Sequence, residues 1–246
     1  CKQKARAQQL AAQLHAANNE RRRHQEQVFR EAWFQCEQQR DLSREKVLTL
    51  WGAGWHEGVI GVVAARISDR PGRPAVLVSV RGDNARGSAR SLEPFDIVAA
   101  LSRCDDLLRQ YGGHAMAAGL QLHAQHLEEL RQRLNQVADE QLTEEDLRPS
   151  IAIDAELPLS QLSLELAEQL GQLGPFGEGN PEPLFSATPV LMREVRRIGD
   201  RTHLSFRAAD CAEGPWWDCV GFGLGSLGDV LECAERAALC FHLRTD

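Results

Sequence analysis

The chain has 246 residues, of which 43% are hydrophobic and 26% are charged, and it carries a net charge of −7. No stretch approaches the roughly 20 consecutive apolar residues of a membrane helix, and the seven cysteines never form a CxxC pair. These features argue against a membrane protein, a disulfide-stapled secreted domain and a uniformly basic nucleic-acid binder. They predict a cytoplasmic protein with reduced thiols.

Residues 1–45 contain no Gly and no Pro and are rich in Gln, Ala, Arg and Glu, which favour helix. Val28, Ala32 and Cys36 repeat at intervals of four, but no heptad pattern is sustained. The segment therefore predicts one long helix with a thin apolar stripe, typical of a helix that spans between domains. Because the chain starts at Cys1 within this pattern, we expect it to be part of a longer protein.

Residues 46–142 alternate between strand and helix patterns. Strands are expected at Val47–Trp51, at Ala75–Val80 and around Gly87–Ser91. Helices are expected after Trp55–Gly58, from Pro94 to about Leu108, and from about Gln125 to Gln141. This alternation predicts a small α/β domain. The polar stretch 143–149 is typical of a linker and is expected to end the domain.

Residues 149–246 predict a small β-barrel. Five short strand patterns are separated by turn signals, at Ile151–Asp154, Pro189–Ile198, His203–Ala208, Trp217–Gly223 and Ala237–Leu243. One helix pattern, about Ser160–Leu173, interrupts them. Such a set fits a barrel of the oligonucleotide-binding (OB) type, with a sandwich of similar size as the alternative.

No complete catalytic motif is present in the sequence. There is no GxSxG, no HExxH and no Walker loop, and the pair His123 and His126 has no acidic neighbour in sequence that would indicate a metal site. Instead, three Gly-rich turns carry polar residues. Trp55–Gly58 opens a helix, where an anion is favoured, and Arg66 follows two turns later.

The other two turns point to phosphate binding. In Gly87–Ser91, strand alternation places Ser88 and Arg90 on one face, and hydroxyl and guanidinium groups are usual phosphate contacts. In Gly112–Gly119, small residues leave space around His114, which can donate to a phosphate or orient a water. Taken singly, each turn is also typical of an ordinary surface loop.

Together these segments resemble a known family. WHEGVIGVVAARI (Trp55–Ile67), GSARS (Gly87–Ser91) and YGGHAMAAG (Tyr111–Gly119), in this order, resemble the DHHA1 domain of RecJ exonucleases. GPFGEGNPEPLF (Gly174–Phe185) resembles the start of that family's OB domain. The resemblance implies a long connecting helix over 1–45, a DHHA1-type α/β domain over 46–142, and an OB-type β-barrel over 149–246. The barrel is expected to be truncated, because the chain stops before the last strands that the family usually has.

RecJ enzymes degrade single-stranded DNA in the 5′→3′ direction in repair and recombination, with Mn²⁺ or Mg²⁺ held by Asp and His of a DHH domain. The chain has no Asp-His-His run, so the resemblance implies metal ligands outside it and no nuclease activity in the fragment. It further implies that Gly113 and His114 approach the scissile phosphate. The residues expected to grip DNA phosphates are Arg66, Ser88, Arg90, Ser91 and His56, with Arg196 and Arg197 in the barrel.

The expected partner is single-stranded DNA, bound by a monomer, and binding to single-strand-binding protein is a family-level expectation. Two other functions stay open. One is a nucleic-acid-binding module without chemistry. The other is a DHH-family phosphodiesterase on short nucleotides, because the Gly-Gly-His element also occurs in such enzymes and in alanyl-tRNA synthetases. The long helix and the barrel argue against the phosphodiesterase, since small substrates need no extended binding path.

Overall fold

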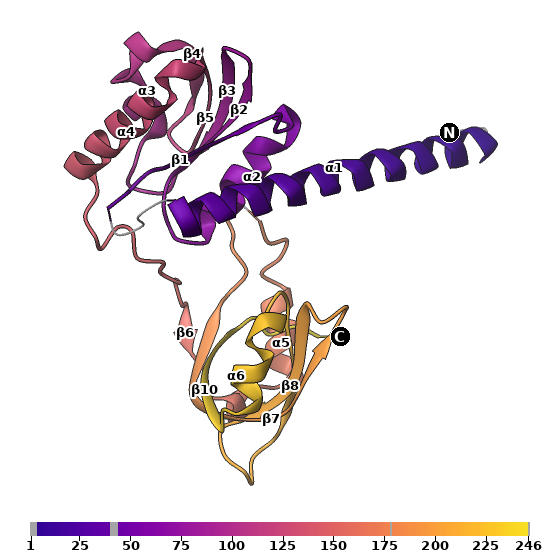
Figure 1. Cartoon of the computed structure of the whole chain (residues 1–246). Coiled ribbons are helices and arrows are strands. Elements are labelled where there is room, and N and C mark those ends of the chain that lie inside the picture. The colour runs from indigo at the N-terminus through magenta and orange to yellow at the C-terminus, as the bar shows by residue number, and fades with distance from the viewer. Residues whose placement is uncertain (1–3, 40–43, 178, 246) are drawn as a thin grey trace. The chain divides into compact units, whose positions relative to one another are not determined.

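The computed structural model describes residues 4–39, 44–177 and 179–245 (Figure 1). Its chain divides into two compact units between Pro149 and Ser150. Residues 1–3 and 40–43 of the expected connecting helix lie outside the described residues, as does Glu178 of the OB-like motif.

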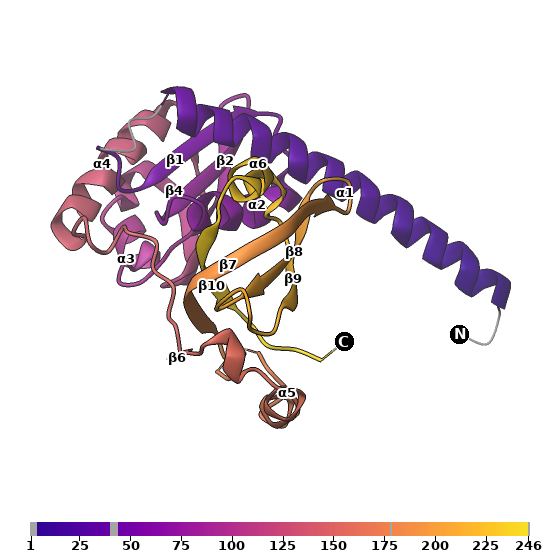
Figure 2. The ribbon, with the colours of Figure 1, turned by 90° about the horizontal axis from the view of Figure 1, so that it is seen from below.

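The first unit begins with a long helix, α1 (Lys4–Gln39). Only the C-terminal part of α1 is packed: Val28, Ala32 and Cys36 are buried, whereas Leu10 and Leu14 are exposed. This part lies along α2 (Glu57–Asp69), and the rest of α1 extends beyond the sheet of the unit (Figures 1 and 2). The spacing of four residues between Val28, Ala32 and Cys36 predicted this narrow contact stripe.

A five-stranded sheet forms the centre of the first unit, in the order β1-β2-β3-β5-β4. Its strands are β1 (Leu48–Ala53), β2 (Ala75–Arg81), β3 (Asn84–Arg90), β4 (Leu108–His114) and β5 (Ala117–His123). The α2 helix crosses over between the parallel strands β1 and β2, and the other pairs are antiparallel. One apolar core joins α1 and α2 to the sheet, and a second joins α3 (Ile97–Ser102) and α4 (Leu127–Gln141) to it.

Two expectations for this unit were wrong in extent. The helix expected from Pro94 to Leu108 covers only α3, which begins at Ile97 because the Asp96 carboxylate accepts from the N–H groups of Val98 and Ala99. Short 3-10 turns follow, over Asp105–Leu107 before β4 and over Ala124–His126 after β5. The Gly-Gly-His stretch, expected as a turn, lies in β4.

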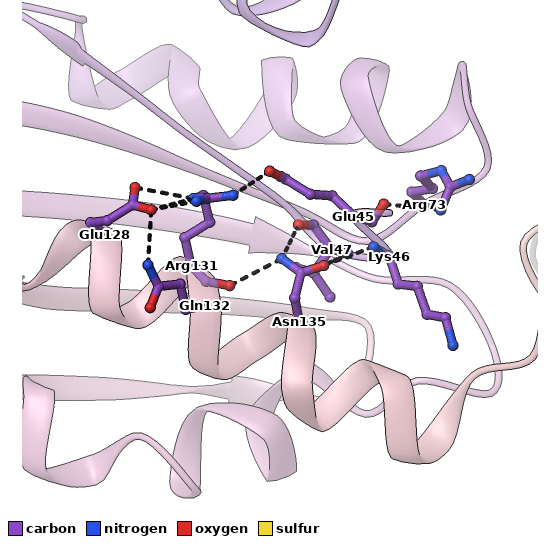
Figure 3. Close-up of polar contacts among 8 residues, drawn as sticks. All are labelled: Glu45, Lys46, Val47, Arg73, Glu128, Arg131, Gln132 and Asn135. Carbon is purple, nitrogen blue, oxygen red and sulfur yellow. Dashed lines mark hydrogen bonds and ion pairs between the residues drawn. The ribbon is translucent and has the colours of Figure 1, made fainter. Parts of the chain in front are cut away.

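The segment that enters β1 is held by α4 (Figure 3). The Asn135 Oδ1 accepts from the backbone N–H groups of Lys46 and Val47 at 2.7 and 3.0 Å, and its Nδ2 donates to the Val47 carbonyl at 2.9 Å. Arg131 forms ion pairs with Glu45 and Glu128 beside it. The amide of Asn135 therefore serves the backbone groups that no strand pairs at this point.

The second unit is built on one curled sheet, in the order β10-β7-β8-β9 with β6 beside β7. The strands are β6 (Ala155–Glu156), β7 (Phe185–Ile198), β8 (His203–Ala209), β9 (Trp217–Gly221) and β10 (Arg236–Phe241). Irregularities in the β7 pairing, one of them between Arg193 and Arg196, let this long strand bend. A single sheet that curls into a half-barrel agrees with the OB-type prediction and not with a sandwich.

Helices and short turns complete the second unit. The helix expected at about Ser160–Leu173 is α5 (Leu164–Gly171), which begins where the Ser163 side chain caps the N–H of Leu166. Short 3-10 turns lie at Leu159–Gln161 and Gly225–Leu227, and the short helix α6 (Gly228–Glu232) was not predicted. The strand expected at Ile151–Asp154 is wrong, since pairing starts only at Ala155.

Candidate nucleic-acid groove

Strand register places the predicted phosphate-binding residues on one face of the first sheet. Directly paired residues of neighbouring strands point to the same face, so the pairings define rows across all five strands. One row consists of Leu50, Leu77, Ser88, Gly119 and Gly112, and the next consists of Leu48, Ala75, Arg90, Ala117 and His114. This face, called the groove face below, changes from apolar on β1 and β2 to polar on β3 and to small residues on β5 and β4.

The α2 helix covers the apolar part of the groove face and also borders β3, where Gly61 lies beside Ser88 and Arg90. A groove of about 730 Å³ lies beside the helix, over β3, β5 and β4. Its walls include Glu57 and Gly61 of α2, and its floor includes Arg86, Ser88 and Arg90 of β3, with Gln110 of β4 and Gln121 of β5. The groove is therefore bounded by a helix on one side and floored by strand residues.

Arg90 is the least neutralised cation of this floor. Its Nη1 donates to the carbonyl of Ala89 at 2.8 Å and to the Ser88 Oγ at 3.4 Å. Within the part of the chain that the structure describes, Arg90 forms no ion pair, whereas Arg86 pairs with Glu57 at 3.3 Å. A half-buried guanidinium with a neighbouring hydroxyl and no carboxylate suits a phosphate, which it can grip with two N–H groups.

Glycines around the groove fall into two kinds. A Cβ added at Gly112 or Gly119 would meet nothing within 4 Å, so open space lies above these two residues on the groove face. A Cβ at Gly113 would collide with the backbone of Ala117, and one at Gly87 would lie 2.8 Å from the Leu120 side chain. Gly113 also has a φ of +152°, which favours glycine. The first kind leaves room for a ligand, and the second kind lets the strands pack.

His114 lies at the end of β4, exposed and in the same row as Arg90. Two strand spacings separate them, which is about 10 Å. The His114 Nδ1 accepts from the Met116 N–H at 3.4 Å. A neutral ring in this arrangement carries its proton on Nε2, which can donate to an anion. Gly113, predicted beside it, is paired with the buried Ala118 and points away from the groove face.

Three other predicted residues make contacts outside the groove. The Arg66 guanidinium pairs with Glu26 of α1 at 3.2 Å and stacks 3.8 Å from the centre of the Phe29 ring. The Ser91 hydroxyl donates to the carbonyl of Phe95 at 2.6 Å. His56 caps α2, with its Nδ1 accepting from the Gly58 N–H at 3.1 Å. In this structure all three serve the fold around the groove.

The two barrel arginines differ from each other. Arg197 is half-buried and pairs with Asp229 at 2.7 Å and Glu232 at 3.6 Å, both on α6. Arg196 is exposed and forms no ion pair among the described residues. Among the aromatic residues of the second unit, Phe206 is in the core. Phe222, which sequence reasoning missed, is 74% exposed.

Two buried or half-buried thiols are held in the protonated form, and the described residues offer no metal centre. Burial raises the pKa of the Cys104 thiol to about 11 and that of Cys219 to about 11, so both stay protonated at neutral pH. Across residues 4–39, 44–177 and 179–245, no group of three or more His, Cys, Asp and Glu could hold a metal ion. None of the helices described is both long and apolar enough to cross a membrane.

Sequence reasoning missed Arg86, Gln110 and Gln121 of the groove floor, and it took Gly112 and Gly119 as part of a turn. Alternation along β3 could have indicated Arg86, which shares the parity of Ser88 and Arg90. The β4 and β5 residues could not be found in the same way, because glycine and glutamine carry no strand signal and β4 was expected as a turn.

Comparisons with known proteins agree with the two units. Residues 44–140 match the DHHA1 domain family and residues 153–246 match the RecJ OB domain family. The single-stranded-DNA-specific exonuclease RecJ of Bacillus subtilis is 36% identical over 236 residues, which are 95% of this chain and 30% of that protein.

Two solved structures of RecJ from Thermus thermophilus show the same fold. The structure in complex with Mg²⁺ has a TM-score of 0.78 at 30% identity and covers 99% of this chain and 36% of that one. The structure in complex with Mn²⁺ has a TM-score of 0.71 at 32% identity, with 90% and 34% covered. The chain thus spans about a third of the length of these relatives.

Proposed function

This chain corresponds to the C-terminal region of RecJ exonucleases, with a DHHA1 domain and a RecJ OB domain, and from this we propose that its groove binds the backbone of single-stranded DNA. The bound strand would be presented for 5′→3′ exonucleolytic cleavage. The observation that carries the proposal is the half-buried Arg90, which has Ser88 beside it and no carboxylate partner among the described residues. It lies next to a floor kept open by Gly112 and Gly119.

The groove residues receive separate roles in this proposal. Arg90 and Ser88 bind phosphate oxygens, since charge-assisted hydrogen bonds from guanidinium groups are strong and geometrically specific. His114, about 10 Å away across the sheet, donates from Nε2 to the phosphate that is cleaved and stabilises its developing charge. Gly113 lets β4 approach β5 closely and so positions His114. Arg66, Ser91 and His56 contribute by holding α2 and the end of β3 in place.

The metal-dependent part of the reaction is assigned to residues outside this chain. The Thermus relatives were solved with Mg²⁺ and Mn²⁺, but the described residues of this chain offer no ligand set that fits such an ion. The second unit also binds single-stranded DNA in this proposal, with Arg196 contacting a phosphate. Arg197 supports that contact through its ion pairs with α6.

Single-strand binding by the 246-residue chain tests the proposal. Arg90→Ala is expected to weaken the binding of a fluorescein-labelled oligonucleotide by about tenfold, the size of one lost charge-assisted hydrogen bond. The matched control is Arg103→Ala, which removes the same charge from the end of α3 on the opposite side of the sheet. Circular dichroism of each variant checks that the fold is retained.

Three outcomes would contradict the proposal. Equal affinity of the wild-type chain and Arg90→Ala would remove the groove as the binding site. A dinucleotide that binds as tightly as a long oligonucleotide would favour a phosphodiesterase acting on short nucleotides. Metal-dependent degradation of DNA by the purified chain with Mn²⁺ would place catalytic residues within these 246 residues.

A further inference from the structure

The polar face of the first sheet continues past the groove to the opposite end of β3. Asn84 pairs with His123 on β5, one row beyond the row of Arg86, Gln121 and Gln110. Arg109 of β4 joins them: its Nη1 donates to the Asn84 Oδ1 at 2.7 Å, and its Nε donates to the His123 Nε2 at 3.0 Å. Asn84 and Arg109 are exposed, and His123 is half-buried.

A β-bulge places Arg109 in this cluster. Leu108 pairs with Leu122 and Gln110 pairs with Gln121, so β4 has one residue more than β5 between these pairs. The extra residue lets Arg109 and Gln110 both face the groove, in contrast to regular alternation. A shift of one residue moves every later side chain to the other face. The same bulge therefore also brings Gly112 and His114 to the groove face.

The charge of Arg109 is oriented but not neutralised. The His123 ring accepts from Arg109, which requires the neutral ring, and the Asn84 amide oxygen is uncharged. Arg109 forms no ion pair in the part of the chain that the structure describes, unlike Arg131 and Arg133 on α4, which are paired with carboxylates. Two neutral acceptors fix the plane of the guanidinium and leave its full charge for an anion.

Arg90 and Arg109 therefore lie at opposite ends of one polar strip. The strip follows the seven residues of β3, about 20 Å at 3.4 Å per residue. A ligand with one anionic group can reach only one of these ends. A strand with a phosphate about every 3.4 Å when stacked reaches both, and 20 Å then spans about six phosphates, or fewer in a stretched strand.

Building on the proposed function, we propose that Arg109, held by Asn84 and His123, forms a second phosphate subsite for single-stranded DNA at the end of the strip opposite Arg90. The strand lies along β3 between the two subsites. The bare backbone at Gly112 and Gly119 leaves room for it beside Arg90. The subsite holds a phosphate several nucleotides away from the one at Arg90.

The test compares oligonucleotides of two lengths and several salt concentrations, using the 246-residue chain and fluorescence anisotropy. Arg109→Ala is expected to weaken the binding of an oligonucleotide of about ten nucleotides by roughly tenfold. The slope of log affinity against log salt should fall by about 0.7, the value for one phosphate contact to a single strand. Binding of a dinucleotide should not change, because it is too short to reach from Arg90. Arg109→Lys should keep the slope and lose only part of the affinity, and Arg103→Ala is the control.

Each other outcome overturns the subsite. If Arg109→Ala leaves affinity and slope unchanged while Arg90→Ala weakens binding, the subsite is wrong and the proposed groove stands. If Arg109→Ala weakens the binding of the dinucleotide and of the long oligonucleotide equally, Arg109 acts through the shape of β4 and not on a distant phosphate. If the wild-type chain binds neither oligonucleotide, the proposed function fails together with the subsite.

Discussion

Replacing Asn135 by alanine should destabilise the first unit by an amount that can be worked out from its hydrogen bonds. The side chain serves three backbone groups of the segment entering β1: the N–H groups of Lys46 and Val47 and the carbonyl of Val47. Its fourth bond goes to the Arg131 carbonyl within α4 (Figure 3). Asn135→Ala leaves the first three groups without this partner.

Each of the three unmade bonds costs roughly 1 kcal/mol at a half-buried site, and the higher helix propensity of alanine returns about 0.5 kcal/mol. The expected loss of unfolding free energy is therefore about 2.5 kcal/mol. For a unit of this size, about 2.5 kcal/mol corresponds to a melting temperature lower by about 5–10 °C. The control is Gln136→Ala, which makes the same change of propensity at an exposed position and should stay within about 0.5 kcal/mol of wild type.

Two measurements check this prediction. Urea unfolding followed by tryptophan fluorescence gives the free energy of unfolding. Hydrogen exchange gives a local signal, because the amide protons of Lys46 and Val47 are bonded to the Asn135 Oδ1 and should exchange much faster in Asn135→Ala. If both amides keep their protection and the unfolding free energy is unchanged, the side chain does not hold the start of β1, and this reasoning is refuted.

Two further predictions concern the groove and the second unit. Gly119→Leu should fold normally and weaken single-strand binding by at least tenfold, because its side chain enters the open space over the floor. Gly113→Ala should instead lower the melting temperature, because the added Cβ clashes with the backbone of Ala117. Normal binding by folded Gly119→Leu would contradict the proposal that DNA occupies the floor. Burial alone would raise the pKa of Asp210, but hydrogen bonds from Ser160 and the Leu159 N–H lower it below its ordinary value. The stabilisation from this carboxylate is therefore present above about pH 4 and lost as the pH falls through the folded pKa. Acid titration of Asp210→Asn should show a smaller loss of stability below about pH 4 than wild type, and identical acid curves would refute it.

The sequence predicted the parts of the fold that depend on local apolar patterns. The continuous run Ala75–Val80 became β2, and the spacing of Val28, Ala32 and Cys36 became the contact stripe of α1. Alternation also placed Ser88 and Arg90 on one face, because side chains in a strand have a period of two. These features need only neighbours along the chain, so they can be predicted without knowing the fold.

Features that depend on distant partners were not predictable. Arg66 is engaged by Glu26, which lies 40 residues earlier in the chain, and Arg197 is engaged by acidic residues of α6. Nothing in the local sequence shows that these cations are already neutralised. Asn135 likewise resembles any polar residue of an exposed helix face, although it holds β1. The bulge at Arg109 shifts the faces of β4 without a proline or glycine at that position to indicate it.

The start of α2 shows how such partners change the charge around a predicted site residue. A helix N-terminus favours an anion, so Trp55–Gly58 was expected to attract a phosphate. The structure already supplies that anion: Glu57 is in the first turn of α2, and its carboxylate also pairs with Arg81 and Arg86. The Glu57 carboxylate satisfies the helix dipole and partly neutralises the nearer end of the floor. Glu57 therefore weakens the attraction of a phosphate to the helix start and to Arg86, whereas Arg90 and Arg109 form no ion pair among the described residues.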